Sequence, residues 1–222
     1  MLTKESLSYL KDLHENNNRV WFEANKKRYE THVKLPFEAF INACLERFKA
    51  DGQDVPLTLQ AKNCIFRIYR DVRFSADKTP YKNHVSAVIS PTGRKNDDTS
   101  GIYIEIAYGR LFIASGIYAP NPAQLLQIRN HIAANKDEFV SLLQQPAFVA
   151  YYGGEIRGEK NKRLTADLQR AAEAQPLLYN KQFYFVNELP SSTCLQADFV
   201  DILMQHYNAA MPMNDFLAAA IL

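Results

Sequence analysis

The spacing of apolar residues changes along this chain, and that change constrains the fold more than any other feature. Up to about residue 50, apolar side chains recur every three or four residues, which is typical of amphipathic helices. From Cys64 they alternate with polar residues, which is typical of strands with one buried face. After Asn121 the helical spacing returns. Helices, then strands, then helices again predict an α+β fold with helical N- and C-terminal segments.

The helical segments carry recognisable start and stop signals. Thr3 is a candidate N-cap for a first helix, and Asn18 for a second that ends near Glu30. Pro36 stands in the first turn of a third, which ends at Asp51. Its apolar stripe consists of Phe37, Phe40, Ile41, Cys44, Leu45 and Phe48. Further helices are predicted from Pro122, over residues 136–144, and over about 197–210, where Pro212 follows.

Alternating segments predict an antiparallel meander sheet of about five strands. The predicted strands are residues 64–74, 85–90, 101–108, 111–118 and 182–188. Gly109-Arg110 fits a tight two-residue hairpin between two of them. We expect helices to pack mainly on one face of the sheet. The chain has neither a linker rich in Pro, Gly or Ser nor an internal repeat, so we expect one domain over residues 1–222.

Composition argues against several classes of function. Cys44, Cys64 and Cys194 have neither disulfide-framework nor CxxC spacing, so we expect reduced thiols in a cytoplasmic protein. No apolar run approaches the roughly 20 residues of a membrane span, so we expect no membrane partner. The five histidines lack metal-ligand spacing, and the glycine patterns of nucleotide-binding loops and nucleophile elbows are absent. We therefore expect no metal and no cofactor.

Positive charge is concentrated in one basic segment, residues 62–84. It holds six Lys/Arg against two Asp, a balance of +4, whereas the whole chain carries +2. Alternation sorts residues 66–74 into two faces. The expected core face carries Phe66, Ile68, Val72 and Phe74, and the exposed face carries Arg67, Tyr69, Asp71 and Arg73. Arg70 falls on the apolar face, so it needs a carboxylate partner or a backbone bulge near Arg70-Asp71.

A polar turn after Phe74 would bring the cations of this segment together. Arginine forks and lysine ammonium groups are what a phosphate or carboxylate ligand requires. The cations expected within reach of one another are Arg67, Arg73, Lys78, Lys82 and His84. The predicted ligand-binding residues are Arg67, Tyr69, Arg70, Arg73, Asp77, Lys78, Tyr81 and Lys82. Asp71 and His84 are the nearby candidates for a general acid or base, so the segment alone does not decide between enzyme and binding protein.

The same segment carries the pattern R-x-x-R-D-x-R-F followed by D-K-x-x-Y. Its members are Arg67, Arg70, Asp71, Arg73, Phe74, Asp77, Lys78 and Tyr81. With this pattern the chain resembles a bacterial family of uncharacterised proteins, a domain of unknown function. The resemblance extends over nearly the whole chain, including residues 17–22 and 116–120. It implies no established activity, but a signature of polar and charged residues favours a site.

Trp21, Asn25 and Tyr29 recur every four residues and would share one helix face. Aromatic residues at this spacing are typical of core packing. A buried Asn25 amide would need hydrogen-bond partners, which Arg70 or Asp71 could supply. We therefore expect these three residues to support the basic segment.

Three functions fit the basic segment. The first is a pocket for a small phosphorylated or carboxylated ligand. The second is a structural or interaction protein whose arginines form internal ion pairs with Asp71, Asp77 or Glu105. The third is nucleic-acid binding by a basic aromatic strand face, which the net charge of only +2 makes less favourable. The sequence does not predict an oligomeric state.

Overall fold

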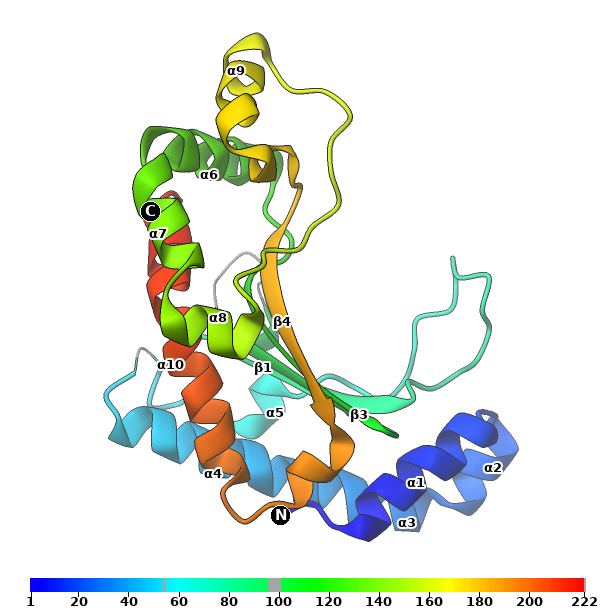
Figure 1. The fold of residues 1–222 in the computed structure, drawn as a ribbon. Coiled ribbons are helices and arrows are strands. Elements are labelled where there is room, and N and C mark those ends of the chain that lie inside the picture. The colour runs from blue at the N-terminus through cyan, green and yellow to red at the C-terminus, as the bar shows by residue number, and fades with distance from the viewer. Residues whose placement is uncertain (54, 96–100, 222) are drawn as a thin grey trace. The chain divides into compact units, whose positions relative to one another are not determined.

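The structure, a computed structural model, describes residues 1–53, 55–95 and 101–221. It confirms the α+β prediction, since helices precede and follow one antiparallel sheet of four strands (Figure 1). The strands are β1 (His84–Ile89), β2 (Ile102–Ala107), β3 (Arg110–Ile117) and β4 (Phe183–Pro190). They are hydrogen-bonded in this order across the sheet, so consecutive strands are neighbours.

Helices make up most of the remaining chain. They are α1 (Lys4–Glu15), α2 (Arg19–Ala24), α3 (Lys26–Tyr29), α4 (Leu35–Ala50), α5 (Ala61–Cys64), α6 (Pro122–Ala134), α7 (Lys136–Leu143), α8 (Pro146–Tyr152), α9 (Ala166–Ala174) and α10 (Phe199–Ala218). A π-helical turn, Glu30–Lys34, joins α3 to α4. Short 3-10 turns lie at Gly93–Lys95, Pro176–Tyr179 and Ser191–Leu195.

The start of the second helix is confirmed, and its end is corrected. Asn18 caps α2, because its side-chain oxygen accepts the Trp21 N–H (3.0 Å). The predicted helix to Glu30 is interrupted at Asn25, whose φ of −108° leaves the helical range. The Asn25 amide donates to the Trp21 carbonyl (2.9 Å), which competes with the regular helical bond. The helix therefore continues as α3 in a new direction.

The predicted strand over residues 64–74 is wrong. Cys64 ends α5, and the residues after it pair with the next segment only at two isolated antiparallel bridges, Ile65 with Ala87 and Tyr69 with Tyr81. The stretch from Tyr81 to Ala87 is two residues longer than the opposing stretch from Ile65 to Tyr69. The register is therefore interrupted between the bridges, and not near Arg70-Asp71, where a bulge was one of the two alternatives for Arg70. Four strands remain in place of about five.

The last helix is longer than predicted. α10 continues through Pro212 to Ala218, whereas the proline suggested an end near Ala210. The residues that follow Pro212, including Met213, Phe216 and Leu217, are buried in one apolar cluster. Burial of these side chains offsets the lost backbone hydrogen bond. Burial of side chains against the rest of the unit thus outweighs the tendency of Pro212 to end the helix.

The described residues form two compact units, and the prediction of one domain over residues 1–222 stays a prediction. The first unit comprises, of the described residues, 1–53, 55–95, 103–113 and 188–204. Its core is aromatic: Phe22, Phe37 and Phe48 are fully buried, and Phe40 stacks on Phe199 with ring centroids 4.4 Å apart.

Ion pairs fasten the N-terminal helices of the first unit to one another. The Arg28 side chain, on α3, bonds to Glu5 and Asp12 of α1, each at 2.6 Å. Its guanidinium also lies 5.4 Å from the centre of the Tyr9 ring. α1 and α3 are thereby held as one block.

The second unit, within the described residues, comprises 101–102, 114–187 and 205–221. Its apolar cluster gathers residues from α6, α7, α8 and β4, among them Ile128, Phe139, Phe148 and Phe185. Gly116 lies where β3 meets β4 in this unit. Over the described chain, no helix is both long and apolar enough to cross a membrane.

We predict that Gly116→Ala destabilises the protein far more than Gly109→Ala. Both glycines have positive φ, +104° and +78°, so alanine is strained at either position by about 1–2 kcal/mol. A Cβ at Gly116 would also lie 2.2 Å from the Phe183 carbonyl oxygen, whereas nothing lies within 4 Å at Gly109. Denaturant unfolding should show a loss above about 3 kcal/mol for Gly116→Ala only. Equal losses in the two variants would contradict this account.

Candidate functional site

One asparagine side chain holds the end of the basic segment against the N-terminal helices. Asn17 lies between α1 and α2; its Oδ1 accepts the Tyr81 N–H (3.1 Å) and its Nδ2 donates to the Tyr81 carbonyl (2.9 Å). The same Nδ2 lies 2.6 Å from Oδ1 of Asn83. Phe22 stacks on the Tyr81 ring, with centroids 3.9 Å apart and an interplanar angle of 14°. Tyr81 is therefore buried and fixed by both its backbone and its ring.

Arg70 is paired within its own loop. Its guanidinium bonds to the Asp77 carboxylate and to the hydroxyl and carbonyl oxygens of Thr79. Asp77 also accepts the Thr79 N–H (2.9 Å), and the Arg70 N–H donates to the Pro80 carbonyl (2.9 Å). Arg70 thus has the carboxylate partner that its position requires, and this pair closes the loop that Figure 1 draws in cyan to teal between α5 and β1.

The remaining motif residues are exposed or have other partners. Arg73 forms a bidentate pair with its neighbour Asp71 (2.9 and 2.7 Å), and its side chain is 76% exposed. Lys78 donates to the Val72 carbonyl (2.9 Å), and Arg67 is exposed. Phe74, predicted in the core, is 97% exposed, because regular pairing stops at Tyr69 and the face alternation stops with it. Arg73 and Lys78 thus have other partners, whereas Arg67 lies close enough to Lys82 to lower the pKa of its ammonium.

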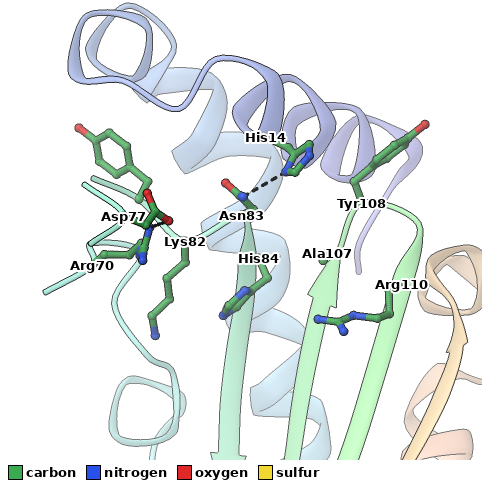
Figure 2. Close-up of a pocket in the computed structure, with 10 residues that line it drawn as sticks. His14, Arg70, Asp77, Lys82, Asn83, His84, Ala107, Tyr108 and Arg110 are labelled. Atoms are coloured by element: carbon green, nitrogen blue, oxygen red, sulfur yellow. Dashed lines mark hydrogen bonds and ion pairs between the residues drawn. The ribbon is translucent and has the colours of Figure 1, made fainter. Parts of the chain in front are cut away.

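A cavity of about 530 Å³ lies within the first unit (Figure 2). Its walls come from the end of α1, the basic loop, the start of β1, and the turn between β2 and β3. The lining residues are His14, Arg70, Asp77, Tyr81, Lys82, Asn83, His84, Ala107, Tyr108 and Arg110. Figure 2 shows the side chains of Lys82 and Arg110 extending on either side of His84.

Glu105, on β2, organises one wall from behind. Its carboxylate accepts the Tyr103 hydroxyl (2.8 Å) and Nη2 of Arg110 (2.6 Å), and it lies 3.4 Å from Nε2 of His84. The Glu105 side chain is only 12% exposed, so its charge is neutralised locally by Arg110. The carboxylate also orients the His84 ring with Nε2 toward Glu105.

The electrostatic environment keeps His84 neutral. Burial lowers the pKa of His84, Glu105 opposes that shift, and Lys82 and Arg110 lower it further. The pKa of Lys82 is also lowered, first by burial and also by Arg67, with Glu105 opposing. At pH 7 His84 is therefore mainly an uncharged imidazole.

Among the described cations that line the cavity, Lys82 is the one without an ion pair to a carboxylate. Arg70 is balanced by Asp77, and Arg110 by Glu105. Among the residues that the structure describes, no carboxylate oxygen lies within 4.0 Å of the Lys82 ammonium, which lies 5.0 Å from the centre of the Phe66 ring. Lys82 is partly buried, so water compensates its charge poorly. The cavity thus carries an excess positive charge.

Hydrogen bonds also define the opposite wall. The Asn83 amide oxygen accepts a hydrogen bond from Asn17, which fixes the orientation of the amide. Nδ2 of Asn83 therefore donates to Nδ1 of His14 (3.0 Å), as Figure 2 shows. His14 therefore carries its proton on Nε2 when neutral. These hydrogen bonds fix Asn83 and His14, which both line the cavity.

The structure brings five of the predicted site residues together, namely Arg70, Asp77, Tyr81, Lys82 and His84. The sequence reasoning missed His14, Asn83, Ala107, Tyr108 and Arg110. Arg110 could have been found, because a meander places the predicted Gly109-Arg110 hairpin at the same end of the sheet as the start of β1. His14 and Asn83 carry no such signal, since only tertiary packing brings them together.

The other predicted residues have structural positions outside the cavity. Trp21 and Tyr29 pack on the Tyr9 ring at 5.5 and 5.7 Å. Asn25 bonds to the Trp21 carbonyl, and not to Arg70 or Asp71 as suggested. The Tyr69 ring lies 5.4 Å from Tyr81 and is 46% exposed. Within residues 1–53, 55–95 and 101–221, no cluster of three or more His, Cys, Asp or Glu could hold a metal ion.

We predict that the loop closed by Arg70 and Asp77 opens in acid at an unusually low pH. The Thr79 N–H, Arg70 and the Thr79 hydroxyl lower the pKa of Asp77 from the ordinary 3.8 to about 2. Because the folded pKa is depressed, the stabilising contacts are complete above about pH 4 and are lost as the pH falls through about 2. The NMR shift of the Thr79 amide should follow that titration, and Asp77→Asn should abolish it. A midpoint near pH 4 would contradict this.

The chain was compared with family models, with curated proteins and with solved structures. Neither the curated proteins nor the solved structures contain a match. A family model described as a conserved hypothetical protein matches residues 5–216, which is nearly the whole chain and includes every residue of the cavity. The resemblance to a family of unknown function is thereby confirmed. The chain belongs to the DUF2461 family of conserved hypothetical proteins.

Proposed function

We propose that this protein binds a small phosphorylated or carboxylated molecule in the cavity between the basic loop and the β2–β3 turn. The observation that carries the proposal is the partly buried Lys82 ammonium, which has no carboxylate partner among the described residues and lies across the His84 ring from Arg110. A partly buried charge without a counter-charge destabilises the protein. A bound anion would supply it.

The size and the lining support a small ligand. Ligand pockets commonly measure about 300–1,000 Å³, and this cavity measures about 530 Å³. Tyr81 and Tyr108 supply aromatic surface, while the cations supply orientation. The combination suits a molecule with a compact anionic group and a less polar body.

Each cation has a distinct part in this proposal. Lys82 is a point charge on a flexible stem, suited to any anionic oxygen. Arg110 uses Nη2 for Glu105, and a guanidinium has five N–H donors, so others can face a ligand. Arg70, paired with Asp77, shapes the wall and adds little net charge. Asp71, a former acid–base candidate, is paired with Arg73 and does not line the cavity, so His84 is the acid–base candidate there.

The three cysteines suit a reducing compartment. Cys44, Cys64 and Cys194 are free and buried, and burial raises the pKa of each thiol. We place the proposed activity in the cytoplasm, where small phosphorylated metabolites are abundant and thiols stay reduced. Oxidised Cys44, Cys64 or Cys194 in protein isolated from cells under thiol-trapping conditions would contradict this placement.

Titration with inorganic phosphate at low ionic strength tests the proposal. We expect measurable heat of binding for the native protein and at least about tenfold weaker binding for Lys82→Gln, because a partly desolvated charge contact contributes about 1.5–3 kcal/mol. Lys78→Gln is the matched control. It removes the same charge from the same loop but outside the cavity, so its affinity should stay within about twofold.

Two results of this titration would count against the proposal. The first is the absence of phosphate binding to the native protein at millimolar concentration. The second is equal weakening by Lys82→Gln and Lys78→Gln, which would indicate attraction by net charge and not a site. Far-ultraviolet circular dichroism of each variant separates loss of binding from loss of folding.

A second candidate, single-stranded nucleic-acid binding, rests on the outer face of the basic loop. Phe74 is 97% exposed beside the Arg73 guanidinium, 5.8 Å from the ring centre, and exposed aromatic rings with cations are typical stacking platforms. It ranks second because Arg73 is neutralised by Asp71. Filter binding to single-stranded RNA at low salt should weaken about tenfold in Phe74→Ser if this candidate is right. Unchanged retention would eliminate it.

A further inference from the structure

We infer that the ligand of this cavity is a dianion of the phosphate monoester class, and that it binds together with one proton, which His84 accepts. The inference rests on the proposed function and narrows it to one class of ligand and one coupled ion. It follows from the charge balance of the walls and from the groups that surround the His84 ring.

Before any proton is added, the described charged residues around the cavity sum to one positive charge, which one negative charge on a ligand would balance. Asp77 cancels Arg70 and Glu105 cancels Arg110, which leaves the single charge of Lys82. A carboxylate or another monoanion would be balanced by Lys82 alone. A phosphate monoester near neutral pH approaches two negative charges, so it leaves one charge unbalanced. A proton on His84 would balance that charge.

The groups that face His84 explain why its ring takes up a proton only when an anion is bound. Lys82 stands on the same segment, Glu105 on β2, and Arg110 on β3. Lys82 and Arg110 repel a proton from the ring, and among the described residues only Glu105, at 3.4 Å, attracts it. Glu105 is already engaged by Arg110 and Tyr103. The empty cavity therefore favours neutral imidazole.

A dianion placed between Lys82 and Arg110 would reverse this balance. Figure 2 shows His84 between these two cations, so an anion bound to both lies close to the ring. Its charge offsets theirs at the imidazole and raises the pKa of His84, while Glu105 continues to attract the proton. Binding and protonation are then linked, and each strengthens the other.

Sulfate is the appropriate probe, because it remains a dianion throughout the neutral range and takes up no proton itself. We propose calorimetric titrations of the whole protein with sulfate, near pH 7, in two buffers that differ in ionisation enthalpy. The difference in heat gives the number of protons taken up per sulfate bound. We expect a positive fraction of one proton, and an affinity that falls several-fold between about pH 6 and pH 8. Acetate should bind without proton uptake.

Three histidine variants locate the proton. His84→Gln keeps a hydrogen-bonding group beside Glu105 and should abolish proton uptake and the pH dependence of sulfate affinity. His14→Gln alters the other histidine of the cavity, and uptake should persist. His32→Gln, at a half-buried position in the π-helical turn and outside the cavity lining, is the matched control for the loss of a histidine.

The outcomes separate this inference from the proposed function. If sulfate and acetate bind equally and neither brings a proton, the inference is wrong and the anion site stands. If uptake disappears in His14→Gln and persists in His84→Gln, the assignment to His84 is wrong. If neither anion binds, the proposed function itself fails. Proton uptake with sulfate that is lost only in His84→Gln establishes the inference.

Discussion

The cavity depends on one contact, the pairing of the Asn17 side chain with both backbone groups of Tyr81. An amide side chain here acts as a neighbouring strand would, and it satisfies a buried peptide group that no strand reaches. Stacking of Phe22 on Tyr81 adds apolar burial to the same contact. Lys82 and His84 follow directly along the chain, so their positions are set by this anchor.

The charged signature of the basic segment therefore has two different roles. Arg70, Asp77 and Tyr81 close the loop and hold it in place, which is the internal ion-pair arrangement expected of a structural module. The charges that would face the proposed ligand are those of Lys82 and Arg110, and neither residue belongs to the R-x-x-R-D-x-R-F pattern. Structural and binding interpretations are thus compatible, because Arg70, Asp77 and Tyr81 of the pattern line the cavity of the proposed site.

The sequence predicted what depends on local spacing. The apolar stripe of α4, the Asn18 cap and the alternation in β2 each reflect neighbouring residues, and each is confirmed. Features that depend on contacts between residues far apart in the sequence were not predicted. Alternation placed Phe74 in a core, but the backbone pairing that supports alternation ends at Tyr69. The excess charge of Lys82 also could not be read from spacing, since it depends on which cations Asp77 and Glu105 neutralise.

A crystal structure of the protein soaked in selenate would show whether an anion occupies the cavity beside Lys82. Selenium scatters anomalously, and selenate is a dianion of the same shape as sulfate. The account predicts an anomalous peak in the cavity, within hydrogen-bonding distance of the Lys82 ammonium and the Arg110 guanidinium. An empty cavity in saturating selenate, with Lys82 paired to a carboxylate of its own chain, would contradict it.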